Sequence, residues 1–121
     1  MRTKLMVFLA AMSSVAITLP VEAATPAHFE IEVSVIAGVN EVEKYRADGM
    51  TVADLRSRTR KLGSDSVVGL VCFPDGSEKN FTMFDVVSRG KLTSTAKSYG
   101  GTEKSSLQSL CLAHHVKYHG R

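Results

Sequence analysis

The sequence predicts an α+β domain of two layers, in which an antiparallel or mixed sheet of three to four strands carries two helices and one disulfide. Three observations predict this fold class. Apolar residues alternate with glutamates over residues 29–35, as in a strand with one wet face. Residues 67–73 form the longest apolar run after the N-terminal segment, which suits a central strand. Residues 103–119 place their apolar positions at helical spacing.

Residues 1–23 have the features of a secretory signal peptide. Arg2 and Lys4 form a positive n-region, residues 5–19 are apolar, and small residues stand where a signal peptidase cuts. We expect cleavage at the end of this segment or one residue later, which leaves 24–121 as a single secreted domain. The apolar run is shorter than the roughly 20 residues that a membrane span needs, so an uncleaved anchor is the less favoured alternative and we expect no membrane span.

The two cysteines, Cys72 and Cys111, most simply form one intramolecular disulfide in an exported chain. The face of the predicted terminal helix consists of Leu107, Leu110, Cys111, His114 and Tyr118. A helix that buries this face on the sheet brings Cys111 to the side of the central strand that carries Cys72. Cysteine count and helical phase therefore predict the same bond. An intermolecular pair and two free thiols remain as alternatives.

Capping signals predict a first helix over residues 51–62. Thr51 can cap its N-terminus, and Asp54 stands three residues on, where a carboxylate completes a capping box. Gly63 is a typical C-terminal stop. The polar and charged residues 39–49 before this helix are predicted to be a connection.

Turn signals divide the rest of the chain. Residues 74–77, Pro-Asp-Gly-Ser, predict a tight turn into a hairpin partner over residues 80–87. A second turn follows at 88–90, and residues 92–99, rich in serine and threonine, are predicted to form a solvated edge strand. The helix over 103–119 comes last. If the first and central strands are parallel neighbours, the helix between them should cross right-handed.

Charge and motifs exclude several functional classes. The whole chain has 15 basic and 12 acidic residues; without Arg2, Lys4 and Glu22 of the signal peptide, 13 and 11 remain. This mild excess does not predict nucleic-acid binding, which needs a dense basic surface. The sequence contains no Gly-x-Ser-x-Gly, no His-Glu-x-x-His and no phosphate-binding glycine loop. Glu30 and Glu32 could form an acid-base pair, but a wet strand face explains them more simply.

The C-terminal histidines are the most suggestive chemistry. His115 and His119 are four residues apart, a spacing that lets two imidazoles share a metal on a helix. If Cys111 is in a disulfide, only these two ligands remain, with His114 or His28 as a third, and two ligands make a weak site. The alternative is a basic helix end whose histidines favour the negative helix terminus. We therefore predict no metal and no cofactor.

Two further features concern the surface. The predicted outer face of the first helix carries Arg56, Arg58, Arg60 and Lys61. Arginine is favoured at interfaces, so this face is a candidate partner contact, although a solvated helix face is the simpler interpretation. Asn80 opens an N-glycosylation sequon with Phe81 and Thr82, which has meaning only in a eukaryotic secretory route.

These features together predict a small secreted non-enzymatic protein that acts by binding a partner protein, of which a virulence effector acting on a host protein is one form. In layout alone the chain resembles small proteins that microbes secrete, such as effectors of plant-associated fungi, and this resemblance carries over no functional residues. A bacterial periplasmic or exported inhibitor of the immunity type is the first alternative. A small secreted hydrolase or nuclease that uses the C-terminal histidines is the second.

Overall fold

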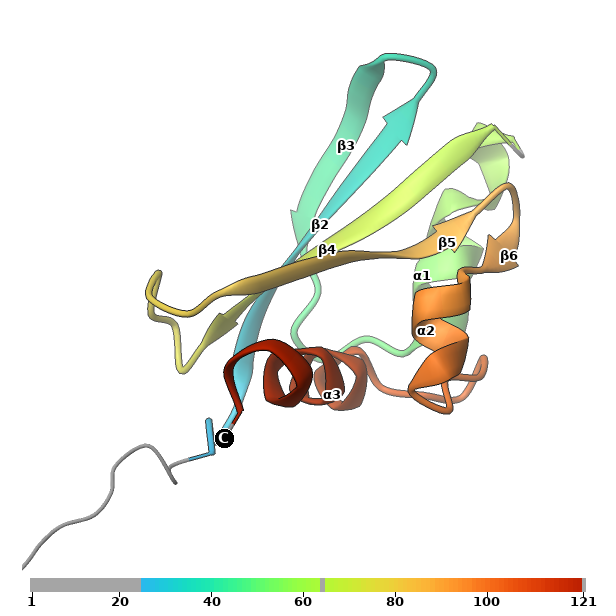
Figure 1. Cartoon of the computed structure of the whole chain (residues 1–121). Helices are drawn as coiled ribbons and strands as arrows, with labels where there is room; N and C mark the ends of the chain where they lie inside the picture. Colours follow the sequence, from blue (N-terminus) through green and yellow to red (C-terminus); the bar gives the residue numbers. More distant parts are fainter. Residues whose placement is uncertain (1–24, 64, 121) are drawn as a thin grey trace, which may run out of the picture.

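A five-stranded antiparallel sheet, in the order β3-β2-β4-β5-β6, forms one layer of the protein, and the helices form the other (Figure 1). The computed structural model describes residues 25–63 and 65–120; the predicted signal peptide lies outside this part of the chain. The strands are β2 (Phe29–Ala37), β3 (Asn40–Arg46), β4 (Ser66–Pro74), β5 (Thr82–Ser88) and β6 (Lys91–Leu92). The helices are α1 (Val52–Thr59), continued by the 3-10 turn η3 (Arg60–Leu62), α2 (Ser94–Ser98) and α3 (Leu107–His119).

The predicted α+β class is confirmed, with one more strand than the three to four expected. The additional strand is β3, which occupies residues predicted to be a connection. Gly38, at a φ of 67°, turns the chain so that β3 pairs antiparallel with β2. Strand β3 was not predicted because its residues are mostly charged, as in a loop. Edge strands also carry charged side chains, which prevent pairing with another chain. The prediction for residues 39–49 was therefore wrong for most of that segment.

The predicted edge strand over residues 92–99 was also wrong. Only Lys91–Leu92 pair with β5, and the chain then forms the short helix α2. Thr93 explains the change, because its hydroxyl oxygen accepts from the Ala96 amide at 3.2 Å and so caps α2. The same hydroxyl donates to the Asp85 carbonyl at 2.7 Å, which ties the cap to β5. A threonine that could have been a strand residue is thus a helix N-cap.

The first helix begins as predicted. Thr51 and Asp54 form the reciprocal capping box, and Gly63, at a φ of 84°, ends the helical segment after η3. The terminal helix α3 begins at Leu107, four residues later than predicted, with Ser106 as its N-cap. Residues 103–105 are used elsewhere, since the carbonyls of Glu103 and Ser105 accept from the first amides of α1.

The central strand β4 lies between β2 and β5, antiparallel to both. The condition of parallel neighbours, on which the right-handed crossover depended, is therefore not met. Alternate β4 residues, Val68, Leu70 and Cys72, are buried against the helix layer together with Ile31 and Val33 of β2. The hydrophobic core consequently occupies one face of the sheet only. Within residues 25–63 and 65–120, no helix has the length and apolar character required to cross a membrane.

The disulfide between Cys72 and Cys111 is confirmed, and it joins the C-terminal part of β4 to the middle of α3. Both cysteines are fully buried, and their Cα atoms are 5.8 Å apart. Leu107 and Leu110 of α3 are buried beside the bond, as the amphipathic phase of the helix predicted. The bond closes the chain across a sequence separation of 39 residues.

We expect replacement of both Cys72 and Cys111 by alanine to lower the free energy of unfolding by about 4 kcal/mol, because the unfolded chain loses a constraint on a loop of roughly 40 residues. Urea denaturation followed by circular dichroism measures this difference. As a control, a reducing agent should destabilise the native protein and leave the double variant unchanged. A loss below about 1 kcal/mol would show that packing alone holds α3 on the sheet.

Candidate functional site

The two faces of the sheet have different surroundings. All helices lie on one side of the sheet in Figure 1, and no described element covers the other side, which we call the outer face. Burial follows this division along β4, where residues facing the helices are fully buried and the alternate residues remain partly exposed. The outer face is therefore the side of the sheet that is open to contact.

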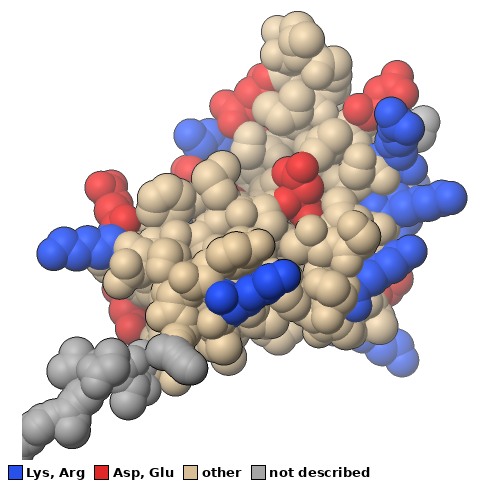
Figure 2. All heavy atoms as spheres, viewed as in Figure 1, with Lys and Arg blue, Asp and Glu red and all other residues tan. Residues whose placement is uncertain are grey.

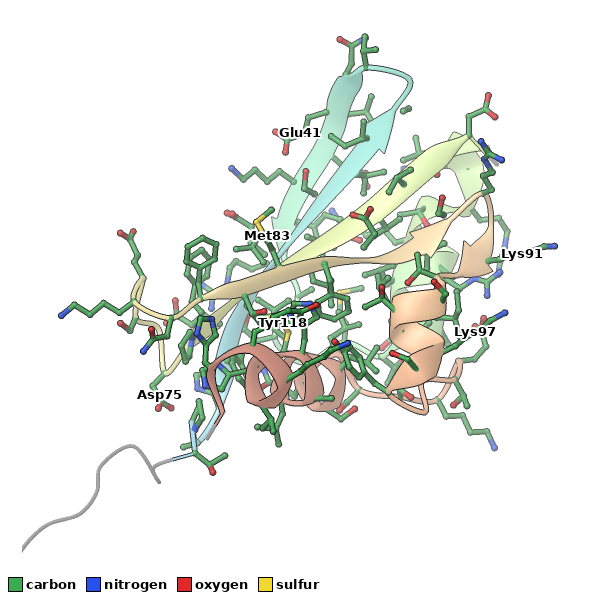
Figure 3. All side chains as sticks on the ribbon, in the orientation of Figure 1. Glu41, Asp75, Met83, Lys91, Lys97 and Tyr118 are labelled. Carbon is green, nitrogen blue, oxygen red and sulfur yellow. A yellow bond between two sulfur atoms is a disulfide. The ribbon has the colours of Figure 1, made fainter. Side chains whose placement is uncertain are left out.

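The outer face carries an apolar band that runs across three strands and the turn before β5. Its members are Ile36, Val67, Val71, Phe73, Phe81 and Met83. Met83 is 60% exposed, and Figure 3 shows it projecting from β5 on the side opposite Tyr118 and α3. Phe81 is 43% exposed, and its ring lies 6.0 Å from that of Phe73. Large apolar side chains grouped in this way on a surface are typical of an interaction site.

A hollow of about 360 Å³ lies within the band, and Gly69 of β4 is among the residues that line it. The register places Gly69 between Ser34 of β2 and Asp85 of β5. Ile36, Val67, Val71 and Met83 provide the apolar walls. A Cβ atom at Gly69 would lie 3.2 Å from a carboxylate oxygen of Asp85, so any side chain here would occupy the hollow. Glycine inside a strand weakens it and often marks a place where another molecule approaches the backbone closely.

Four carboxylates and two basic groups share the outer face: Glu30, Glu32, Glu41, Asp85, Lys44 and Arg46. The Lys44 Nζ lies 3.7 Å from Glu32, and an Nη of Arg46 lies 3.9 Å from Glu30. Among the described residues, Glu41 and Asp85 have no basic partner. The Ser34 hydroxyl lines the hollow from β2 and donates to Glu41, while Asp85 lines the hollow from β5. The uncompensated negative charge of the outer face is therefore concentrated around the hollow.

The pairing of Glu30 and Glu32 with basic side chains supports the wet-face interpretation over an acid-base pair. Each glutamate pairs diagonally with a cation of the neighbouring strand β3, because the register places Arg46 opposite Glu32 and Lys44 opposite Ser34. Cross-strand pairs of opposite charge stabilise a sheet by a few tenths of a kcal/mol up to about 1 kcal/mol.

The predicted partner-contact residues of α1 divide into two groups. Arg56 donates to the Gly90 carbonyl and forms an ion pair with Glu103, which fastens α1 to the turn between β5 and β6. The guanidinium of Arg58 lies 3.6 Å from the centre of the Tyr45 ring. These two arginines therefore make contacts within the protein.

The other two residues of this group, Arg60 and Lys61, are exposed in η3 and have no ion pair within the described part of the chain. They face solvent beside a shallow hollow of about 250 Å³ that Arg60 and Gly63 help to line. Figure 2 shows basic side chains gathered at the right margin, where α1, β6 and α2 lie, while the surface over β5 is mostly uncharged. A partner contact at the arginine face remains a prediction.

The histidines of α3 are packing residues. His114 and His115 are each 8% exposed. The His114 ring stacks on Phe84 with centroids 4.6 Å apart, and its Nδ1 forms a hydrogen bond with the Thr82 hydroxyl. The His115 ring meets that of Phe29 edge-on at 5.6 Å. Both imidazoles therefore hold α3 against the sheet.

The structure brings two of the predicted weak metal ligands together. The ring centres of His115 and His119 are 5.1 Å apart, and His119 also lies 3.2 Å from the Phe81 carbonyl. Cys111 is in the disulfide, and His28 is at the start of β2, where it lies 3.8 Å from Asp48. Within the described residues, no group of three or more histidine, cysteine, aspartate or glutamate side chains is arranged to hold a metal ion.

The predicted glycosylation residue, Asn80, lies in the turn between β4 and β5 and is exposed, with a φ of 59°. Asparagine tolerates this left-handed backbone better than most residues. Thr82, the third residue of the sequon, is buried and contacts His114. Glycosylation at Asn80 remains a prediction.

The outer face is the feature that sequence reasoning missed. A signal was present in β4, where Val67, Val71 and Phe73 make the second face of the strand apolar as well. A strand that is apolar on both faces calls for cover on both faces. Comparison with known protein families, with curated proteins and with solved structures finds no match to this chain.

Burial lowers the pKa of His114, and the nearby charges of Lys117 and His119 lower it further. Burial likewise lowers the pKa of His115, assisted by His119 and opposed by a hydrogen bond with the Asn80 backbone. In the unfolded chain both imidazoles titrate near a pKa of about 6.5, so below that pH the unfolded state binds more protons than the folded state. The stability that depends on neutral imidazoles is thus complete above this pH and is lost as the pH falls toward the lower folded-state pKa values.

We expect the free energy of unfolding to decrease between pH 7.5 and about 5, because the unfolded chain binds protons at these imidazoles while burial in the folded protein disfavours their protonation. Urea denaturation at a series of pH values measures it. His114→Gln should flatten the dependence, although it also lowers stability at every pH. An unchanged slope in the His114 variant would contradict the assignment.

Proposed function

We propose that this is an exported, non-enzymatic protein that acts by binding a partner protein, and that the outer face of the sheet is its binding surface. One observation carries the proposal. The apolar band crosses the open side of the sheet, and no described element of the chain covers it. Interfaces between proteins combine such an apolar centre with a polar rim, and here the charged residues of β3 supply part of the rim.

Two structural features support the class of protein. A disulfide persists in oxidising compartments, which favours export of the chain. The same bond uses both cysteines, so neither provides a thiolate nucleophile. The buried position of His114 and His115 in aromatic contacts favours a packing role over general acid-base chemistry. These observations favour binding over the alternative of a hydrolase or nuclease.

Two forms of such a protein follow from the sequence. One is a virulence effector that acts on a host protein, and the other is an exported inhibitor of the immunity type. Both act by covering a surface of another protein, and both fit an open sheet face with an apolar band. The proposal therefore concerns the binding surface that the two forms share.

The test is capture of a binding partner by the exported protein with a photo-crosslinking residue at position 67 in the apolar band. We expect Met83→Arg to reduce capture of the specific partner at least about tenfold, since a bulky charged side chain would replace an apolar contact of the band and could itself pair with Asp85 across the hollow that both residues line. Val116→Arg is the matched control. Val116 is 53% exposed on α3, in the layer on the opposite side of the sheet, and its change should leave capture intact.

Three outcomes would contradict the proposal. Equal capture by the Met83 variant would place the interface elsewhere. Loss of capture only after charge reversal of Arg60 and Lys61 would move it to the arginine face. Self-association that Met83→Arg abolishes, observed by sedimentation velocity, would show that a second copy of the chain covers the band.

A further inference from the structure

We infer that the hollow over Gly69 receives a lysine or arginine side chain presented by the partner protein, an inference that rests on the proposed function. The first step is the shape and lining of the hollow. Its volume of about 360 Å³ lies within the range of small-molecule sites and is lined mainly by aliphatic side chains. The long methylene stems of lysine and arginine pack on such apolar surface while their charged heads remain in a polar environment.

The second step is charge complementarity. Asp85 lines the hollow from β5, Glu41 accepts a hydrogen bond from Ser34, which lines it from β2, and neither carboxylate has a basic partner among the described residues. A cationic head placed in the hollow would gain charge-assisted hydrogen bonds to one or both carboxylates. An acidic side chain would be repelled there, and an aliphatic one would cover Asp85 without compensating its charge.

The third step is the role of Gly69. Glycine leaves the backbone of β4 bare at the one position where Ser34 and Asp85 flank the strand. The incoming side chain can therefore lie directly on the sheet, with its head close to the Asp85 carboxylate. A larger residue at position 69 would fill this space, because its Cβ atom alone would lie 3.2 Å from Asp85.

The fourth step concerns the segment that presents the side chain. The outer face carries four carboxylates against two basic groups, whereas the arginines of α1 lie in the other layer. A basic and apolar segment of the partner matches both the charge and the apolar band. Such complementarity steers association and sets specificity more than it sets affinity.

The experiment is an NMR titration of the ¹⁵N-labelled exported protein with three tripeptides, acetyl-Leu-Lys-Leu-amide and the same peptide with norleucine or glutamate in the middle. We expect the lysine peptide to bind most tightly, the norleucine peptide about threefold to tenfold more weakly, and the glutamate peptide weakest. Shifts should centre on the amides of Ser34, Gly69 and Asp85. Rising salt should reduce the preference for lysine.

Variants separate the charge from the hollow itself. Asp85→Asn, and more completely Asp85→Asn with Glu41→Gln, should reduce binding of the lysine peptide to the level of the norleucine peptide. Gly69→Ala should weaken both peptides, with the fold verified by circular dichroism. Glu78→Gln removes an exposed carboxylate from the turn after β4 and should change nothing.

The outcomes distinguish this inference from the proposed function. Equal binding of the lysine and norleucine peptides, or a lysine preference that survives removal of both carboxylates, would overturn the cation assignment. If Met83→Arg still abolishes partner capture in that case, the proposed binding surface stands without it. A lysine preference in the hollow, together with partner capture that Met83→Arg leaves unaffected, would instead overturn the proposed function.

Discussion

The covalent attachment of α3 to β4 is the constraint on which the rest of the structure depends. Cys72 faces the helix layer from the central strand, and Cys111 meets it from the middle of the helix. The bond and the buried leucines beside it commit α3 to one face of the sheet. Because α1 and α2 also lie on that side, the core is one-sided and the outer face remains open (Figure 1). A small domain buries a smaller fraction of its surface on folding than a large one, and here one face of the sheet stays open as well. The crosslink is therefore more important for stability.

Charge is distributed in accordance with this division. Arg56 and Arg58 belong to the helix layer, where they bind a carbonyl, a carboxylate and an aromatic ring of neighbouring elements. Two of the basic side chains of α1 thus make contacts within the protein. On the outer face, Asp85 and Glu41 have no such partner among the described residues, so this mildly basic chain presents a locally acidic surface. Net charge alone could not indicate this surface, because net charge does not say which groups are already paired.

The sequence predicted the parts of the fold that depend on local or covalent rules. Strand β2, the capping box of α1, the β4–β5 turn and the disulfide follow from alternation, capping, turn chemistry and cysteine count. Strand β3 and helix α2 were not predicted, because the local sequence of each is compatible with two different structures. A charged segment can be a loop or an edge strand, and Thr93 can belong to a strand or cap a helix. Tertiary contacts with β2 and β5 decide between them.

The candidate site was not predicted because it depends on which face of the sheet the helices cover, and local sequence patterns do not show this. Val67, Val71 and Phe73 give β4 a second apolar face, and two apolar faces normally indicate a strand covered on both sides. The chain after the predicted signal peptide has three α-helices in its described part, and all of them cover the same face. The apolar side chains of the other face must either remain in water or be covered by another molecule. The apolar side chains are grouped around a hollow that contains Gly69 and the unpaired Asp85 carboxylate, which favours cover by another molecule. Apolar residues exposed singly on a surface would require neither a glycine nor an unpaired carboxylate beside them.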